Sequence, residues 1–253
     1  MAERTVYFHG IPGSGGELAL FGAEIAAKAA GFIVPDRTQA GPAEATARFC
    51  TLASAIRTQA EGAPLRLVGF SLGAAAALRV APHLGTQVVG IDLVSAAAPL
   101  STGDYLGAMA GAPVFRAART SPLLLAAMVG AQGLFARLAP EKLYAALFAS
   151  AQGADLALRD DLQFRAGMVR VLSRALGRGA PGYRREILHY VGDWAAELAH
   201  VSQPVRLWHG RADNWSPVSM AEALATHLPR CEPPRMFDGL SHYSTLRRYL
   251  SER

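Results

Sequence analysis

The sequence predicts an α/β protein with a mainly parallel sheet of about six strands, flanked by helices and carrying one helical insertion. Short apolar runs alternate with longer helix-forming runs in the first and last parts of the chain, as expected when helices join parallel strands. The run Val88–Val94 is apolar apart from Asp92, which is typical of a strand buried on both faces. A chain of 253 residues suits one such domain with an insertion better than two independent domains.

The individual elements follow from the local patterns. Short apolar runs bounded by turn-forming residues predict strands at 5–8, 32–34, 65–70, 88–94, 204–208 and 234–237. The runs between them predict helices over 17–30, 42–61, 71–81, 218–228 and 243–250. Gly62 and Pro64 should end the second helix, because neither residue favours a helix interior.

Residues 99–200 interrupt the alternation. They show helical patterns at 121–135, 140–151, 156–176 and 183–199 but no convincing strand. We therefore expect a core made of residues 1–98 and 201–253, with residues 99–200 inserted between its fourth and fifth strands.

The most specific motif is Gly69-Phe70-Ser71-Leu72-Gly73, between a predicted strand and a predicted helix. In that context G-x-S-x-G indicates a sharp turn that strains the serine backbone and requires small residues on either side. The Ser71 hydroxyl would lie at a helix N-terminus, where the helix dipole favours developing negative charge. The alternative is an ordinary glycine-bounded turn with a capping serine, because short motifs also match by chance.

Three further segments favour the first interpretation. They are His9-Gly10-Ile11-Pro12-Gly13-Ser14-Gly15-Gly16, Leu207-Trp208-His209-Gly210-Arg211-Ala212-Asp213, and Gly239-Leu240-Ser241-His242. With them the chain resembles the α/β-hydrolase superfamily, whose nucleophile, acid and histidine follow the order of Ser71, Asp213 and His242. Two features depart from that family: two strands that usually precede the His-Gly loop are absent, and Ser241 stands where glycine is usual.

The resemblance implies that Ser71 is the nucleophile, His242 its base, and Asp213 the carboxylate that orients the imidazole. Asp92 and Asp238 are the alternative acids, and Asp213 is preferred because it lies in the family's usual loop. Two other histidines precede a glycine at a strand end, and we expect them to be buried and hydrogen-bonded to backbone: His9 and His209.

The oxyanion of a tetrahedral intermediate needs two hydrogen-bond donors. The first expected donor is the N–H of Leu72, which follows the serine. The second is the N–H of Ile11, because Pro12 carries no N–H. Trp215 either lines the pocket or covers the loop that carries Asp213, and the sequence leaves both possibilities open.

The resemblance also implies that residues 99–200 form a cap over the nucleophile. The bulky apolar residues of this segment include Met109, Phe115, Met128, Phe135 and Phe148. Most should form the core of the cap itself, and a minority should face the cleft and make it mainly apolar. The candidate substrate contacts are Trp215, Phe70, Met109, Phe115 and Met128.

Composition argues against several other classes of protein. The net charge of +5 is spread along the chain without a basic block, which argues against a nucleic-acid partner. Two cysteines, Cys50 and Cys231, and scattered histidines predict no disulfide scaffold and no metal site. The absence of a signal-like start and of an uninterrupted apolar span predicts a cytoplasmic protein without stable membrane insertion.

These features predict a cofactor-independent serine hydrolase whose partner is a small-molecule acyl substrate. A carboxylic ester with a small hydrophobic acyl group is the preferred substrate. The same residues could cleave a carbon–carbon bond, a lactone, a thioester or an N-terminal peptide, because one fold serves many chemistries. A non-catalytic ligand-binding protein is the alternative from another class. The sequence leaves the oligomeric state open.

Overall fold

The computed structural model describes residues 1–38, 42–178 and 180–253, which form an α/β fold around one parallel sheet. Within these residues the sheet has five strands in the order β1-β2-β3-β4-β5. The strands are β1 (Arg4–Phe8), β2 (Leu65–Phe70), β3 (Val88–Val94), β4 (Val205–Gly210) and β5 (Arg235–Phe237). All neighbouring strands pair in parallel, which confirms the predicted class.

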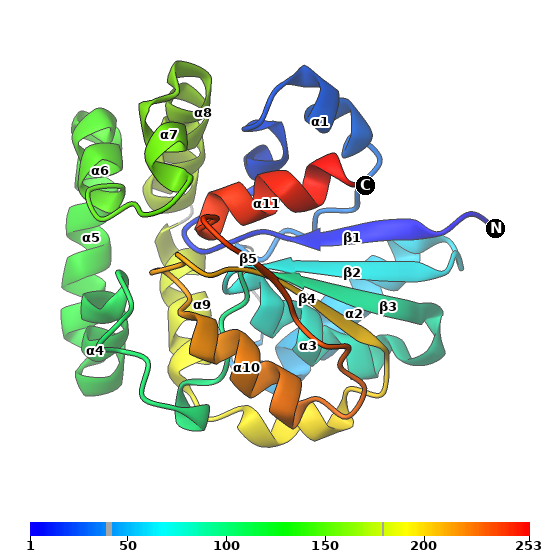
Figure 1. Ribbon diagram of the computed structural model, residues 1–253. Helices are drawn as coiled ribbons and strands as arrows, with labels where there is room; N and C mark the ends of the chain where they lie inside the picture. Colours follow the sequence, from blue (N-terminus) through cyan, green and yellow to red (C-terminus); the bar gives the residue numbers. More distant parts are fainter. Residues whose placement is uncertain (39–41, 179) are drawn as a thin grey trace.

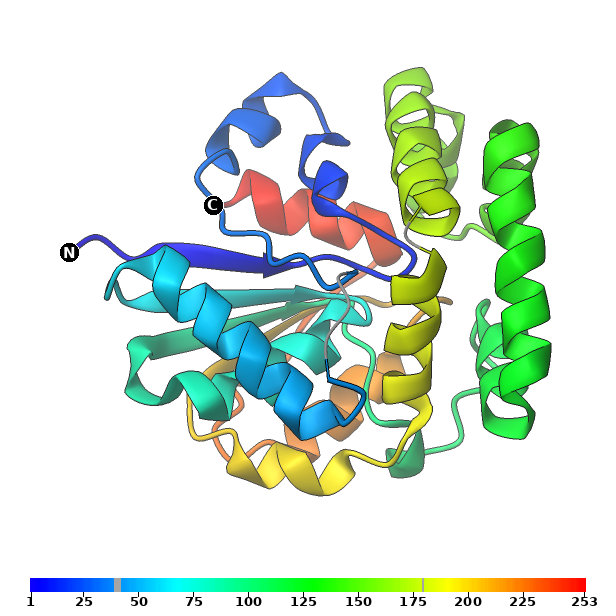
Figure 2. The same ribbon diagram turned by 180° about the vertical axis from the view of Figure 1, so that it is seen from behind.

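Helices cover both faces of the sheet. Helices α1 (Ala23–Lys28) and α11 (His242–Ser251) lie on one face, and α2 (Ala45–Ala60), α3 (Gly73–Leu84) and α10 (Val218–His227) lie on the other (Figures 1 and 2). The central strands are therefore shielded on both sides, and Leu67, Ile91 and Leu207 are buried between the helical layers. This burial fixes the carboxyl ends of the strands, where the loops of the candidate site begin.

Two predicted elements of the core, the strand over 32–34 and the helix over 17–30, are much shorter than expected. Residues 32–34 contribute only one isolated bridge, between Ile33 and Val6 of β1. The following Pro35 has no N–H with which to extend that pairing. The helix predicted over 17–30 is a 3₁₀ turn at Gly15–Ala19 followed by α1, because Gly22, at φ 104°, interrupts it.

The segment between β3 and β4 is helical, and no strand occurs in it among the described residues. Its main helices are α4 (Ala112–Thr120), α5 (Pro122–Leu138), α6 (Pro140–Leu147), α7 (Asp155–Asp160), α8 (Leu162–Leu172) and α9 (Ala180–Val191), with a π-helical turn at Ser173–Arg178. They stand at the end of the sheet toward which the strand arrows point (Figure 1). The helix predicted over 156–176 is divided because Asp161 adopts an extended conformation.

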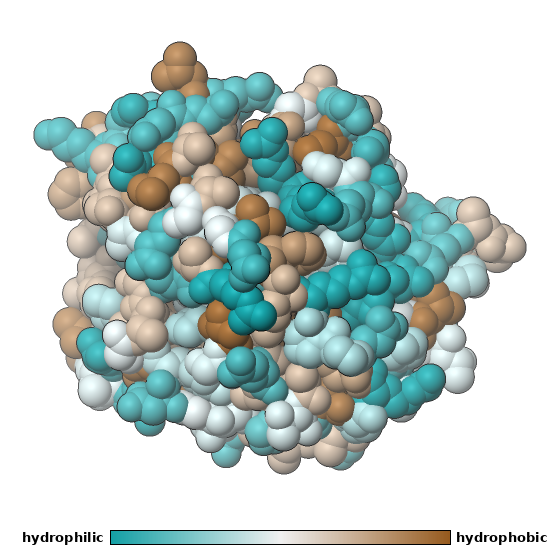
Figure 3. Space-filling model, viewed as in Figure 1, coloured by the Kyte–Doolittle hydropathy of each residue, from teal (hydrophilic) through white to brown (hydrophobic). Residues whose placement is uncertain are grey.

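The surface mixes polar and apolar side chains, as Figure 3 shows for the view of Figure 1. The exposed apolar residues include Leu123, Leu134 and Leu138, all on α5. None of the helices described is both long enough and apolar enough to cross a bilayer.

Candidate active site

Ser71 lies in the tight turn between β2 and α3. Its φ of 55° is in the left-handed region, which a residue with a side chain rarely adopts. A Cβ atom at Gly69 would lie 2.6 Å from Ala74 Cα, and one at Gly73 would lie 2.1 Å from the Phe8 carbonyl oxygen. Both glycines are therefore required by close backbone packing. This packing also brings the loop after β1 against the turn that carries Ser71.

His242 and Asp213 form a buried pair on two other loops of the core. The Nδ1 atom of His242 lies 2.8 Å from Asp213 Oδ2. The other oxygen, Asp213 Oδ1, accepts hydrogen bonds of 2.9 Å from the backbone N–H groups of Trp215 and Ser216. Burial by itself raises the pKa of Asp213, but the charge and hydrogen bond of His242 and the other donors hold that pKa below its usual value.

The backbone and ring of His242 are fixed from several directions. His242 is the first residue of α11, and its carbonyl accepts a 3.0 Å hydrogen bond from the Ser95 hydroxyl. Its imidazole stacks on Trp215, with ring centres 5.7 Å apart, and contacts Phe70 at 4.8 Å. Ser95 carried no sequence signal, because it is an isolated serine after β3.

Ser71 and His242 line the same small cavity of about 10 Å³. Gly10, Ile11 and Pro12 from the loop after β1 form one wall, and Trp215 and Tyr243 form another. The helical insertion contributes the residues that complete the lining, which are Leu147, Phe148 and Leu172. The cavity is therefore built jointly by the core and the insertion.

The remaining candidate contacts lie elsewhere among the described residues. Leu72 lines an adjoining cavity together with Ile11. Phe70 is fully buried beneath the rings of His242 and Tyr243, so it supports the site from below. Three other candidates from the insertion are not among the residues that line the cavity of Ser71: Met109, Phe115 and Met128. Met109 and Phe115 are buried within the insertion, where Phe115 contacts Tyr190.

The alternative acids have other partners. Asp92 is fully buried in β3, and its carboxylate accepts hydrogen bonds from the side chains of Arg206, Tyr249 and Arg253. Asp238 is exposed and pairs with Arg211 at 2.9 Å. Among the described residues, no hydrogen bond joins either of these carboxylates to His242.

The other two histidines at strand ends are buried, and each contacts a backbone carbonyl. His9 Nδ1 lies 2.7 Å from the Gly10 carbonyl oxygen. Burial and the charge of Arg37 lower the pKa of His9 to about 3. His209 Nε2 lies 2.8 Å from the Ser216 carbonyl oxygen, and burial lowers its pKa. Both rings are therefore neutral at pH 7.

Glu17 is a buried acid that sequence reasoning missed. Its Oε2 atom accepts hydrogen bonds from the Gly10 N–H at 3.0 Å and from the Tyr7 hydroxyl at 2.9 Å. A Cβ atom at Gly13 would lie 2.0 Å from Glu17 Oε1, so the glycine loop folds directly over this carboxyl group. Burial raises the pKa of Glu17 to about 7. A single glutamate in a predicted helix gives no sign in the sequence that its carboxyl group is buried and supports the loop after β1.

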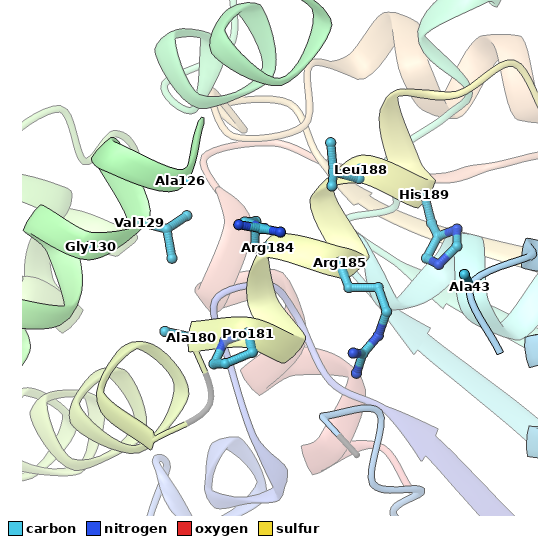
Figure 4. Close-up of a pocket in the computed structure, with 10 residues that line it drawn as sticks. All are labelled: Ala43, Ala126, Val129, Gly130, Ala180, Pro181, Arg184, Arg185, Leu188 and His189. Atoms are coloured by element: carbon cyan, nitrogen blue, oxygen red, sulfur yellow. The ribbon is translucent and has the colours of Figure 1, made fainter. Parts of the chain in front are cut away.

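Two larger hollows lie outside the Ser71 cavity. One, of about 960 Å³, runs between the loop Gly13–Gly16 and residues 173–175, and its lining includes Asp36 and Thr38. The other, of about 610 Å³, lies between α5 and α9, where Val129 faces Arg184 and Leu188 (Figure 4). The described residues hold no cluster of three or more histidine, cysteine or acidic side chains that could bind a metal ion.

Comparison with solved structures gives matches over nearly the whole chain at low sequence identity. The alpha/beta hydrolase enzyme MGS-M2, from a Medee basin deep-sea metagenome library, matches with a TM-score of 0.68 and 15% identity, over 99% of this chain and 87% of its own. A bromoperoxidase from Bacillus anthracis matches with a TM-score of 0.65 and 17% identity, over 100% and 90%. The esterase RhEst1 from Rhodococcus sp. ECU1013 matches with a TM-score of 0.54 and 19% identity, over 99% and 90%.

These likenesses show the fold, and the family follows from the sequence. No curated protein sequence matches the chain. The family model described as "Alpha/beta hydrolase family" matches residues 6–249, which is nearly the full length. The chain therefore belongs to the alpha/beta hydrolase family.

Proposed function

We propose that this protein is a serine hydrolase that cleaves small carboxylic esters through an acyl-Ser71 intermediate. The observation that carries the proposal is the buried His242–Asp213 pair, whose imidazole faces the same cavity as Ser71. A serine hydroxyl becomes an effective nucleophile only when a neighbouring base takes its proton. The alpha/beta hydrolase family consists mostly of hydrolytic enzymes, which agrees with this assignment.

The hydrogen bond to Asp213 fixes the tautomer of His242. An ionised carboxylate can only accept hydrogen bonds, so His242 Nδ1 must carry the proton of its hydrogen bond to Asp213. This leaves Nε2 free to accept the Ser71 proton as Oγ attacks the ester carbonyl carbon. The imidazolium then returns that proton to the leaving alcohol. A water activated in the same way releases the acid and restores the Ser71 hydroxyl.

The proposed oxyanion donors are the backbone N–H groups of Leu72 and Ile11. Leu72 directly follows Ser71 at the start of α3, where the positive end of the helix dipole favours an anion. Ile11 belongs to the loop that Gly73 holds against the turn, since a Cβ atom at Gly73 would also lie 2.6 Å from the His9 carbonyl oxygen. Glu17 fixes the same loop through the Gly10 N–H.

The size of the cavity favours a small acyl group. Its volume of about 10 Å³ is close to the space that a single water molecule needs, so an acetyl group enters only when the lining side chains move, and longer acyl groups need more movement. A third cavity, lined by Ile11, Pro12 and Gly13, borders both this cavity and the hollow of about 960 Å³. We assign the leaving alcohol to that larger, more polar hollow, whereas the acyl group lies beneath Phe148 and Leu172.

A fluorophosphonate probe tests the proposal directly. Wild-type protein should be labelled on Ser71, which mass spectrometry of the labelled peptide would identify, and should hydrolyse p-nitrophenyl acetate. Ser71→Ala should abolish both labelling and turnover. Ser54→Ala is the control, because Ser54 is an exposed serine of α2 that does not line the cavity. Labelling that persists in Ser71→Ala would rule out Ser71 as the nucleophile.

A panel of substrates separates the ester from the alternatives. We expect turnover of acetate and propionate esters to exceed that of lactones, thioesters and aminoacyl amides. A preference for any of the other classes would keep the mechanism of Ser71 and reassign the substrate.

A further inference from the structure

The N-terminal turn of α11, which begins with His242, is capped by a carboxylate from the helical insertion. Asp155 Oδ2 accepts a 2.9 Å hydrogen bond from the Tyr243 N–H, and Oδ1 accepts a 2.7 Å bond from the Ser244 N–H. The first N–H groups of a helix lack partners within the helix, so a side chain that satisfies two of them fixes the position of that turn.

Asp155 is buried, and the residues before it contact the loop that leads to His242. It is only 1% exposed and is the first residue of α7, far from α11 in sequence. The preceding residue, Ala154, donates its N–H to the Gly239 carbonyl oxygen at 2.8 Å, in the loop that leads to His242. Gly153, at φ 51°, is so close that a Cβ atom there would lie 2.5 Å from the Gly239 oxygen and 2.9 Å from Ala212 Cβ.

The insertion also holds the loop that carries Asp213. The Asn214 side chain donates a 2.7 Å hydrogen bond to the Ser150 carbonyl oxygen. The Ala110 N–H donates to the Asn214 carbonyl oxygen at 2.8 Å. The insertion thus contacts the histidine loop and the acid loop on either side of the His242–Asp213 hydrogen bond.

The charge of Asp155 acts in the same direction as its hydrogen bonds. A negative charge at a helix N-terminus interacts favourably with the helix dipole. Burial raises the pKa of Asp155, whereas the hydrogen bonds from Tyr243 and Ser244 and the charge of His242 oppose that rise. Other titratable groups among the described residues that interact electrostatically with His242 include Asp213, His209 and Glu17.

We propose that Asp155 is a positioning residue for His242: its carboxylate fixes the first turn of α11 and stabilises the protonated imidazole. The insertion then completes the histidine's geometry as well as covering the cavity. The catalytic consequence rests on the proposed hydrolase function, whereas the effect on the His242–Asp213 hydrogen bond does not depend on any substrate.

The test compares Asp155→Asn with Asp161→Asn. Asp161 caps α8 of the same insertion by accepting a 2.7 Å hydrogen bond from the Phe164 N–H, but it is exposed and does not line the Ser71 cavity. Asp155→Asn removes the charge and turns an amide NH₂ toward one helix N–H. It should lower kcat on p-nitrophenyl acetate by about 10- to 100-fold with KM changed less, because misplacing a catalytic group costs about that much.

The pH dependence distinguishes positioning from simple capping. In Asp155→Asn the acidic limb of the kcat/KM profile should move to lower pH, because the negative charge that favours a protonated base at the start of α11 is removed. Asp161→Asn should keep kcat and the pH profile of the wild type. Asp155→Glu, which retains the carboxylate, should recover part of kcat and the original acidic limb.

The downfield proton NMR signal of the hydrogen bond between His242 Nδ1 and Asp213 gives a readout without substrate. Asp213→Asn identifies the signal. It should broaden or disappear in Asp155→Asn and persist in Asp161→Asn. If Asp155→Asn does not fold, Asp155→Ser provides the same comparison, because serine keeps one acceptor for a helix N–H.

An unchanged NMR signal and an unchanged acidic limb in a folded Asp155 variant would overturn the proposal. The NMR signal could be lost in Asp155→Asn although the wild-type protein hydrolyses no ester. That result would overturn the proposed function and leave the positioning role of Asp155 standing.

Discussion

Ser71, Asp213 and His242 follow three strands of the core, whereas Leu147, Phe148 and Leu172 above them come from helices of the insertion. The core strands are joined by backbone hydrogen bonds in a fixed register, so the loops at their ends have little freedom. The insertion is held mainly by side-chain packing between helices, and its helix α5 leaves Leu123 82% exposed and Leu138 76% exposed.

The difference indicates a division of roles. A parallel sheet holds reacting groups in fixed positions, while a helical layer can change its side chains and reshape a cavity without altering the sheet. Substitutions in the core loops should therefore affect turnover itself, and substitutions in the cavity wall of the insertion should affect the choice of acyl group. The hydrogen bonds of Asp155 are the proposed exception. The following predictions test this division.

The largest effect is expected at Asp213. Asp213→Asn should preserve the fold but reduce kcat on p-nitrophenyl acetate by about 10⁴-fold, because the amide favours the wrong histidine tautomer. The control is Asp238→Asn, which changes an exposed acid near the same loops and should leave kcat close to that of wild type. Steady-state kinetics with active-site titration would measure both. A small loss in Asp213→Asn would require another acid for His242.

Asp92 should matter for stability and not for chemistry. Asp92→Asn leaves the cations of Arg206 and Arg253 without their buried partner, which should cost about 3–5 kcal/mol of unfolding free energy. The fraction that remains folded should keep its kcat. Urea unfolding followed in parallel with active-site titration separates the two quantities. If kcat per titrated active site fell in Asp92→Asn, Asp92 would contribute to turnover although it lies outside the three loops that carry Ser71, Asp213 and His242.

Glu17 should make stability depend on pH. Burial raises its pKa to about 7 in the folded protein, so the stability it contributes is present at low pH and is lost as pH rises toward and through 7. Glu17→Gln cannot ionise. Its unfolding free energy relative to wild type should therefore increase by about 3 kcal/mol between pH 4 and pH 8. Urea unfolding across that range would measure it, and a difference that does not vary with pH would contradict the prediction.

The smallest effect is expected in the insertion. Leu147→Ala should enlarge the Ser71 cavity and favour longer acyl groups by about fourfold for each added methylene, which corresponds to about 0.8 kcal/mol of burial. The measurement is kcat/KM on acetate, propionate and butyrate p-nitrophenyl esters. Met128→Ala is the matched control, because it truncates an apolar residue of the insertion that does not line the Ser71 cavity. A profile that Leu147→Ala leaves unchanged would mean that this wall does not select the acyl group.

Local patterns predicted the five strands of the sheet better than the single bridge beside β1. The runs 65–70 and 88–94 coincide with β2 and β3, because strands buried on both faces give continuous apolar runs. The run 32–34 looks similar, but one bridge to Val6 is all that forms beside Pro35. A pattern of side chains does not show whether a neighbouring strand offers enough backbone partners.

The candidate site shows the same limit. Leu147 and Leu172 line the cavity without any feature that separates them from the other leucines of the insertion, whereas Met109 and Phe115 are equally apolar and are buried elsewhere. Apolar character predicts burial, and the packing of whole helices decides against which surface a residue is buried.

The sequence by itself determined the alternation of strands and helices and the glycine-bounded turn at Ser71. The steric limit on φ at Ser71 and the close approach of Gly69 to Ala74 act between residues that are near in sequence, so Gly69 records them directly. Gly73 is required by the Phe8 carbonyl oxygen, which only the fold brings close. Only the tertiary structure decided that Asp213 is paired with His242, that Phe148 closes the cavity, and that Asp155 caps α11. These contacts join residues far apart in the chain, and their geometry depends on how every intervening element packs.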